Sequence, residues 1–348
     1  MNCAPSRWTL TLPAKLVRTL TTSAALLLVT ACAGNSVRAP AVLPAGSGVV
    51  ELTDTPFYPP ANVPDSLTAL ATMLGASGVT TATPAELTAA VLLPPQGATI
   101  QAELQTVPPK YARLAYRIAP DLSAILIAVA DHRPVLVRQS SGRSLRSKSH
   151  FAVIIGYDEP HDTLLLRSGS NRRQVLPAGD FMLAWSNADR WAMLVLRPGE
   201  LPAAVSRNDY LKAAADFEQH GARPQDSLLA FDAALKRWPD EPLAWAGRAI
   251  ARLQAGDRPA AARAYATAIR IDGSNATARN GLALILLDLG CVREAQDEID
   301  MVREYVLPEP LRTQVEGSRD RIRARSQPPV PQEPTVCAQL SYLSATDF

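Results

Sequence analysis

Cysteine and histidine side chains often supply a nucleophile, a base or a metal ligand, and this chain has four of each. The cysteines are Cys3, Cys32, Cys291 and Cys337. Since none lies between residues 32 and 291, the middle of the chain has no thiol nucleophile. Three histidines lack the spacing of metal ligands, namely His132, His161 and His220. There is no glycine-rich phosphate loop either, so we expect no metal ion and no cofactor.

Cys32 ends a segment with the features of an export signal. Basic residues precede an apolar stretch at residues 23–30, which is too short to cross a bilayer as a stable helix. Small residues follow directly before the cysteine, and this order resembles the bacterial lipobox. The resemblance implies removal of residues 1–31 as a lipoprotein signal peptide and lipid attachment at Cys32. The alternative is an ordinary secretory signal that ends near a cysteine by chance.

The residue after Cys32 bears on the location of the protein. It is Ala33 rather than an aspartate, which by resemblance to Gram-negative lipoproteins implies sorting to the outer membrane, facing the periplasm. Residues 32–48 are small and include proline, so we expect a tether between membrane and domain. An oxidising compartment would permit a disulfide between Cys291 and Cys337, and two separate thiols are the alternative.

Bulk properties limit the remaining possibilities. A length of 348 residues allows two domains, and 47% hydrophobic residues allow well-packed cores. The net charge of +2 argues against a nucleic-acid-binding protein, which would carry a concentrated basic excess.

Residues 49–202 predict an α+β domain in which helices come first and an antiparallel sheet follows. Capping residues and apolar periodicity predict helices over residues 67–75, 84–92, 100–107 and 121–130. Apolar runs predict strands over residues 134–138, 151–157, 163–167 and 191–196. Asp65 or Ser66 is expected to cap the first helix, and Pro108 and Pro109 are expected to end the third.

Residues 203–326 predict helices only, with a 34-residue period. Two positions show the period well, with Ser227, Ala261 and Ala295 at the first and Phe231, Tyr265 and Ile299 at the second. Small residues let paired helices approach closely, whereas the bulky residue fills the space to the next pair. The pattern resembles about three tetratricopeptide repeats that start near residues 208, 242 and 276, followed by a capping helix over residues 311–324. A generic helical bundle is the alternative, and residues 327–348 predict a disordered tail.

Several motifs in the front region resemble one known family by their order and spacing. FYPP precedes SLTALATMLGASGV, and HFAVIIGYD precedes LRSG. They are similar to motifs of the bacteriocin-processing, double-glycine-leader cysteine peptidases, in particular of their lipoprotein branch with tetratricopeptide repeats. The resemblance covers about residues 56–202 and extends into the repeats. It implies a papain-like peptidase domain followed by an all-α solenoid.

The resemblance also implies where the catalytic groups of the family would lie. The nucleophilic cysteine, at the start of the first helix, falls on Asp65, and the upstream glutamine that donates to the oxyanion falls near Pro60. The histidine is kept as His150, and the residue that orients it falls near Ser168, a serine that the lipoprotein branch also carries. A carboxylate cannot replace a thiolate in this acyl transfer, and proline offers no side-chain donor.

We therefore predict a pseudoenzyme: an envelope lipoprotein that binds a peptide or protein through the former cleft and the repeats. The first alternative is an active peptidase in which Ser66 attacks with His150 as base, although Ser66 would point about 100° away around a helix. The second is a front domain that serves only as a spacer. Basic residues could hold an acidic ligand near the cleft or form a solvated rim: Arg138, Arg143, Arg146, Lys148, Arg167, Arg172 and Arg173.

Overall fold

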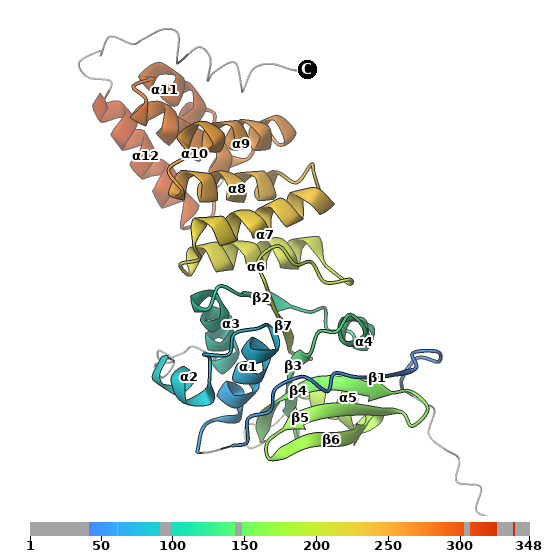
Figure 1. Ribbon diagram of the computed structural model, residues 1–348. Coiled ribbons are helices and arrows are strands. Elements are labelled where there is room, and N and C mark those ends of the chain that lie inside the picture. Colours follow the sequence, from blue (N-terminus) through green and yellow to red (C-terminus); the bar gives the residue numbers. More distant parts are fainter. Residues whose placement is uncertain are drawn as a thin grey trace, which may run out of the picture. The chain divides into compact units, whose positions relative to one another are not determined.

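The computed structural model describes residues 42–60, 62–90, 99–142, 148–302, 307–325 and 337. The signal peptide, Cys32, most of the tether, Arg143, Arg146 and the tail apart from Cys337 lie outside the described residues. No helix in the described ranges is long and apolar enough to cross a membrane. A region of strands and helices is followed by a region of helices alone (Figure 1).

The front region is built on one sheet of seven strands. In chain order they are β1 (Val49–Glu51), β2 (Leu114–Arg117), β3 (Val135–Ser140), β4 (Ser149–Asp158), β5 (Thr163–Ser168), β6 (Asn171–Pro177) and β7 (Ala192–Leu196). Neighbours in the order β2-β7-β3-β4-β5-β6 are antiparallel, and β1 pairs with the end of β4. Gly156 permits the approach of β1, because a Cβ there would lie 2.3 Å from the carbonyl oxygen of Val50.

The structure confirms the four predicted strands and adds three strands that the sequence did not predict. The predicted runs correspond to β3, β4, β5 and β7 with small shifts at their ends. The missed strands are β1, β2 and β6. Strands β1 and β2 have only three and four residues, and β6 is an edge strand whose residues are mostly exposed. Such segments lack the apolar run or clean alternation that identifies a strand from sequence.

Within the described part of the front region, five helices accompany the sheet: α1 (Asp65–Ala76), α2 (Pro84–Ala90), α3 (Ile100–Lys110), α4 (Leu122–Ala130) and α5 (Ala178–Ser186). The prediction missed α5. It also ended α3 too early, since Pro108 and Pro109 lie inside the helix. Proline has a helical φ, and although it lacks the N–H donor, its carbonyl can still accept a hydrogen bond. Near the end of a helix it therefore removes few hydrogen bonds. The carbonyl of Pro108 accepts from the amides of Tyr111 and Arg113.

The sheet separates two groups of buried side chains. Phe151, Val153 and Ile155 of β4 pack with the apolar face of α1. Ala152 and Ile154 belong to the core that includes α4 and α5. The period-two alternation of β4 explains the division, because successive side chains point to opposite faces of a strand.

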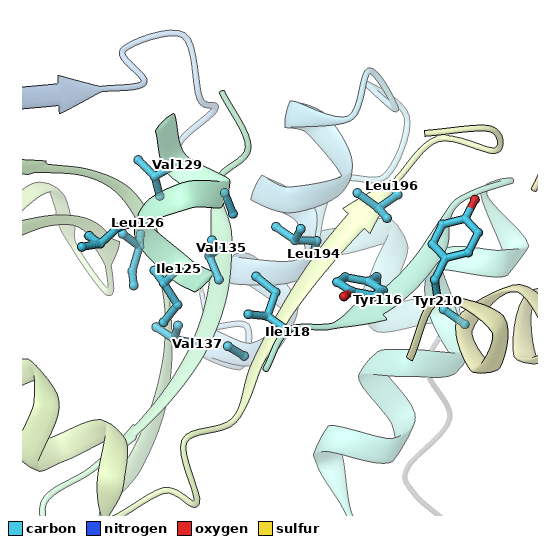
Figure 2. Close-up of a cluster of buried hydrophobic side chains, with 14 of the residues drawn as sticks. Tyr116, Ile118, Ile125, Leu126, Val129, Val135, Val137, Leu194, Leu196 and Tyr210 are labelled. Atoms are coloured by element: carbon cyan, nitrogen blue, oxygen red, sulfur yellow. The ribbon is translucent and has the colours of Figure 1, made fainter. Parts of the chain in front are cut away.

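This second core continues from the sheet into the helical region. Figure 2 shows Tyr116 of β2 beside Tyr210 of α6 (Arg207–Gln219), and their ring centroids lie 6.5 Å apart. The backbone N–H of Ser206, the residue that caps α6, donates to the hydroxyl of Tyr116 at 2.9 Å. The first helix pair therefore packs on the sheet through apolar and polar contacts.

The helical region consists of three helix pairs and a last helix. The pairs are α6 with α7 (Pro224–Arg237), α8 (Pro242–Gln254) with α9 (Arg258–Ile271), and α10 (Ala276–Asp288) with α11 (Val292–Asp300). The last helix is α12 (Leu311–Arg325), close to the predicted capping helix. The first helices of the pairs begin at residues 207, 242 and 276, next to the predicted repeat starts.

Aromatic residues of one helix pair pack against glycines of the next. A Cβ on Gly247 would lie 2.3 Å from the ring of Phe231, and one on Gly281 would lie 2.3 Å from the ring of Tyr265. The two contacts are one 34-residue period apart. The bulky residue at the second repeat position therefore fills the space to the following pair, as its spacing predicts.

A disulfide joins Cys291 to Cys337. Cys291 lies at the start of α11, and both cysteines are buried in the core of the last helices. Of the two alternatives left open by the sequence, the structure has the bonded pair. The bond fixes residue 337 of the C-terminal segment to the third helix pair.

Candidate functional site

Three of the four family positions named above meet where α1 begins beside β4 and β5. A pocket of about 30 Å³ lies there. Pro60, Asp65 and Ser168 all line it, so residues separated by more than a hundred positions share one surface. Aromatic side chains from two segments complete much of the wall: Phe57, Tyr58 and Phe151.

Asp65 makes a long-range contact that the sequence did not predict. Its Oδ2 accepts a hydrogen bond of 2.9 Å from the backbone N–H of Phe151, 86 residues away. That N–H belongs to the peptide bond between His150 and Phe151, so the carboxylate holds the start of β4 against the start of α1.

The expected capping role of Asp65 or Ser66 is wrong. Pro64 occupies the N-cap position, and no side chain there accepts a helix N–H. Asp65 is instead the first helical residue, and its charge still complements the positive end of the helix dipole. The carboxylate instead accepts from the amide of Phe151 in β4.

His150 lies near the pocket through its backbone rather than its side chain. The residue is exposed and is not part of the pocket wall. It pairs with Gln139 across β3 and β4. The structure thus brings the backbone of His150 to Asp65, but it does not place the imidazole in the same pocket.

Ser66 and Ser168 differ in their surroundings. Ser66 is only 3% exposed, and the pocket is lined by its neighbours Asp65 and Thr68 rather than by Ser66 itself. Ser168, at the end of β5, is half-buried and lines the pocket. The serine of the alternative mechanism is therefore turned towards the core, and the serine at the orienting position faces the cleft.

Arg167 lines the pocket, although its sequence neighbours suggested only a basic rim. It is 7% exposed, and its guanidinium donates to the backbone carbonyls of Thr53, Thr55 and Arg172. Burial lowers the pKa of Arg167, and the nearby positive charge of Arg172 lowers it further. Sequence alone gave no signal of this burial, because an arginine at the end of a strand is normally exposed.

The other basic residues of the predicted group that the structure describes do not line the pocket. Among the described members of the predicted group, Arg167 is the one that lines it. Arg173 pairs with Glu51, with Nε 2.8 Å from Oε1, and Arg138 donates to the hydroxyl of Ser149 at 3.0 Å. The solvated-rim interpretation therefore fits these residues better than a common anion site.

Comparison with known proteins gives limited information. No family model matches the chain, and no curated protein matches it. A solved structure from Bacillus anthracis described as a C39-like peptidase has 18% sequence identity and a TM-score of 0.36, covering 43% of this chain and 98% of that one. The type III secretion translocator chaperone SycD of Yersinia enterocolitica has 19% identity and a TM-score of 0.31, covering 35% of this chain and 89% of that one. Likeness at this level carries no conclusion about activity or partners.

Proposed function

We propose that this chain is a lipid-anchored envelope protein whose papain-like peptidase domain is non-catalytic and which binds a peptide or protein partner. One observation carries the proposal. The residue at the family's nucleophile position is Asp65, and its carboxylate is engaged in holding the backbone of β4. The group that would attack a substrate therefore has a structural role.

The rest of the pocket supports a loss of catalysis. Acyl transfer needs a thiolate or activated hydroxyl and a donor aimed at the developing oxyanion. Pro60 stands near the donor position and has no side-chain N–H.

The helical region supports a binding role. Three helix pairs repeat with a 34-residue period, and the aromatic residue of one pair packs on the glycine of the next. These features favour tetratricopeptide repeats, which present an extended surface to a partner. Anchoring through Cys32 would hold this surface at the periplasmic side of the outer membrane.

Peptide cleavage by the purified full chain in detergent is the direct test. We expect mass spectrometry to find no product from a peptide library that includes Gly-Gly sequences. Turnover that disappears in His150→Ala would overturn the non-catalytic assignment. Labelling of Ser66 by a fluorophosphonate, lost in Ser66→Ala, would instead establish the serine mechanism.

The lipid anchor has a separate test. Cys32→Ser should move the protein from the outer-membrane fraction to the soluble periplasmic fraction, and the wild-type N-terminal peptide should carry acyl chains by mass spectrometry. Retention of Cys32→Ser in the membrane fraction would contradict the lipobox interpretation.

A further inference from the structure

The second and third helix pairs differ at equivalent positions between their two helices. Residues one period apart occupy the same place in each pair, so each pair serves as a reference for the other. In the third pair, Leu282 and Leu286 of α10 are 1% and 2% exposed and belong to the core of the last helices. Arg279 of α10 pairs with Glu298 of α11 at an N–O distance of 2.7 Å.

The second pair has a different residue type at all four positions. Arg248 and Arg252 stand where the third pair has leucines. Trp245 stands in place of the arginine, and Ala264 stands in place of the glutamate. The second pair therefore has neither the leucines nor the ion pair that the third pair has at these positions.

A pocket of about 340 Å³ results between α8 and α9, which we call the slot. Its wall on α8 consists of Trp245, Arg248 and Arg252, which are spaced for one helix face. The wall on α9 and the turn before it consists of Asp257, Ala260, Arg263, Ala264 and Thr267. The small alanines leave the slot open.

The charged groups of the slot have an excess of one positive charge. Arg248, Arg252 and Arg263 line it, and two carboxylates face them: Asp257, which also lines the slot, and Asp232, which pairs with Arg248. Oδ2 of Asp257 lies 3.6 Å from Nη1 of Arg252, which is a long distance for an ion pair. Arg263 is exposed, and within the described part of the chain its side chain has no ion-pair partner.

Two members of the slot are held in place before any ligand binds. The indole N–H of Trp245 donates to the carbonyl of Pro239 at 2.8 Å. The guanidinium of Arg248 lies 5.3 Å from the centre of the Trp245 ring. Its Nε is also 2.8 Å from Asp232 Oδ1, as an ion pair without the alignment of a hydrogen bond. An aromatic wall fixed in this way reduces the ordering that binding requires.

We propose that the slot binds an acidic segment of a partner protein, with side-chain carboxylates between Arg252 and Arg263 and an apolar part of the segment on Trp245. This deepens the proposed binding function and rests on it. Guanidinium groups suit the planar carboxylate because two parallel N–H groups can donate to its two oxygens. The glutamate of the third pair, Glu298, shows the same chemistry within the chain, since it accepts from Arg279 at the equivalent place.

Fluorescence anisotropy with the full chain in detergent tests this proposal. The probe is a short labelled peptide of alternating Glu and Ala, and its reference is the same peptide with Gln in place of Glu. We expect the Glu peptide to bind more tightly than the Gln peptide, and more weakly as salt increases. Arg252→Ala and Arg263→Ala should each weaken binding about tenfold, as expected for loss of one charge-assisted contact.

A matched control removes two other positive charges, which lie on α9 outside the slot. Arg258→Ala with Arg270→Ala should leave the affinity unchanged, because both arginines are exposed and neither lines the slot. Ala264→Glu places the residue of the third pair into the second and should abolish binding while circular dichroism shows an intact helical fold.

Two results would overturn the proposal: equal affinity for the Glu and Gln peptides, or equal affinity of the Arg252→Ala/Arg263→Ala variant and the control variant. Cleavage of the probe, detected by its mass, would count against the non-catalytic function and not against the slot.

Discussion

The pocket of the front domain and the slot of the second helix pair differ in size for different structural reasons. The front pocket has about 30 Å³ and is held by contacts between distant segments, such as Asp65 with Phe151 and Arg167 with Thr55, 112 residues apart. The slot has about 340 Å³ and lies within one helix pair. Its opening follows from residue types that can be compared, position by position, with the next pair.

The difference shows what each region uses for stability. In the front domain, one side chain fixes two elements that are far apart in the sequence, so a local change affects the whole arrangement. In the helical region, each helix from α7 onward packs mainly against its neighbours along the chain, whereas α6 also packs on β2. Repeated units of this kind distribute stability between nearest neighbours. Three measurements can break or sharpen this comparison.

Loss of the disulfide should have the largest effect. Replacing Cys291 and Cys337 with serine releases residue 337 from the third helix pair, with an expected loss of about 2–4 kcal/mol in the free energy of unfolding. Hydrogen exchange should show the loss in α10, α11 and α12 and leave the sheet unchanged. A reducing agent should reproduce the effect in the wild type and have none in the variant. An equal loss of protection in the sheet would contradict the view that each helix is stabilised mainly by its neighbours along the chain.

Adding a methyl group at the aromatic–glycine contacts should have the next largest effect. Gly247→Ala and Gly281→Ala place a Cβ against the rings of Phe231 and Tyr265, and overpacking should cost about 1–3 kcal/mol in urea unfolding. Gly317→Ala is the matched control within α12, where a Cβ meets nothing within 4 Å. That variant should gain up to about 1 kcal/mol from helix propensity. Equal destabilisation by all three changes would show that the aromatic contacts are irrelevant.

Tyr116→Phe should have the smallest effect and tests the coupling of the two regions. It removes the acceptor of the Ser206 N–H, with an expected loss of about 0.5–1.5 kcal/mol. Burial raises the pKa of Tyr116. The hydrogen bond from Ser206 lowers this pKa, but by less than burial raises it.

The raised pKa also predicts a pH dependence. Folding favours the neutral phenol of Tyr116. Its contribution to the free energy of unfolding is therefore fully present below about pH 10, which is the pKa of tyrosine in the unfolded chain. It is lost as the pH rises through the folded pKa. The stability difference between wild type and Tyr116→Phe should therefore shrink above about pH 10. If this difference in the free energy of unfolding stays constant above about pH 10, ionisation of Tyr116 does not affect the contact between the sheet and the helical region.

The sequence predicted much of the local structure because local signals are strong in this chain. Helix caps are one such signal: the side chains of Thr83 and Asp121, just before α2 and α4, accept from the amides of Glu86 and Ser123 at N–O distances of 3.3 Å. The long apolar runs of β4 and β5 and the 34-residue period of the helix pairs also required no tertiary information. Edge strand β6 and the two shortest strands were missed, since their partners stabilise them more than their own residues do.

The sequence by itself determined the absence of a thiol between residues 32 and 291, and it indicated a front region of helices and strands followed by a region of helices with a 34-residue period. Tertiary structure alone decided that Asp65 holds the amide of Phe151, that Arg167 is buried, and that Cys291 meets Cys337. It also decided that arginines at leucine positions leave an open slot. Composition and spacing report what a residue can do with its neighbours in sequence. Which distant group meets it depends on how the packed elements approach one another.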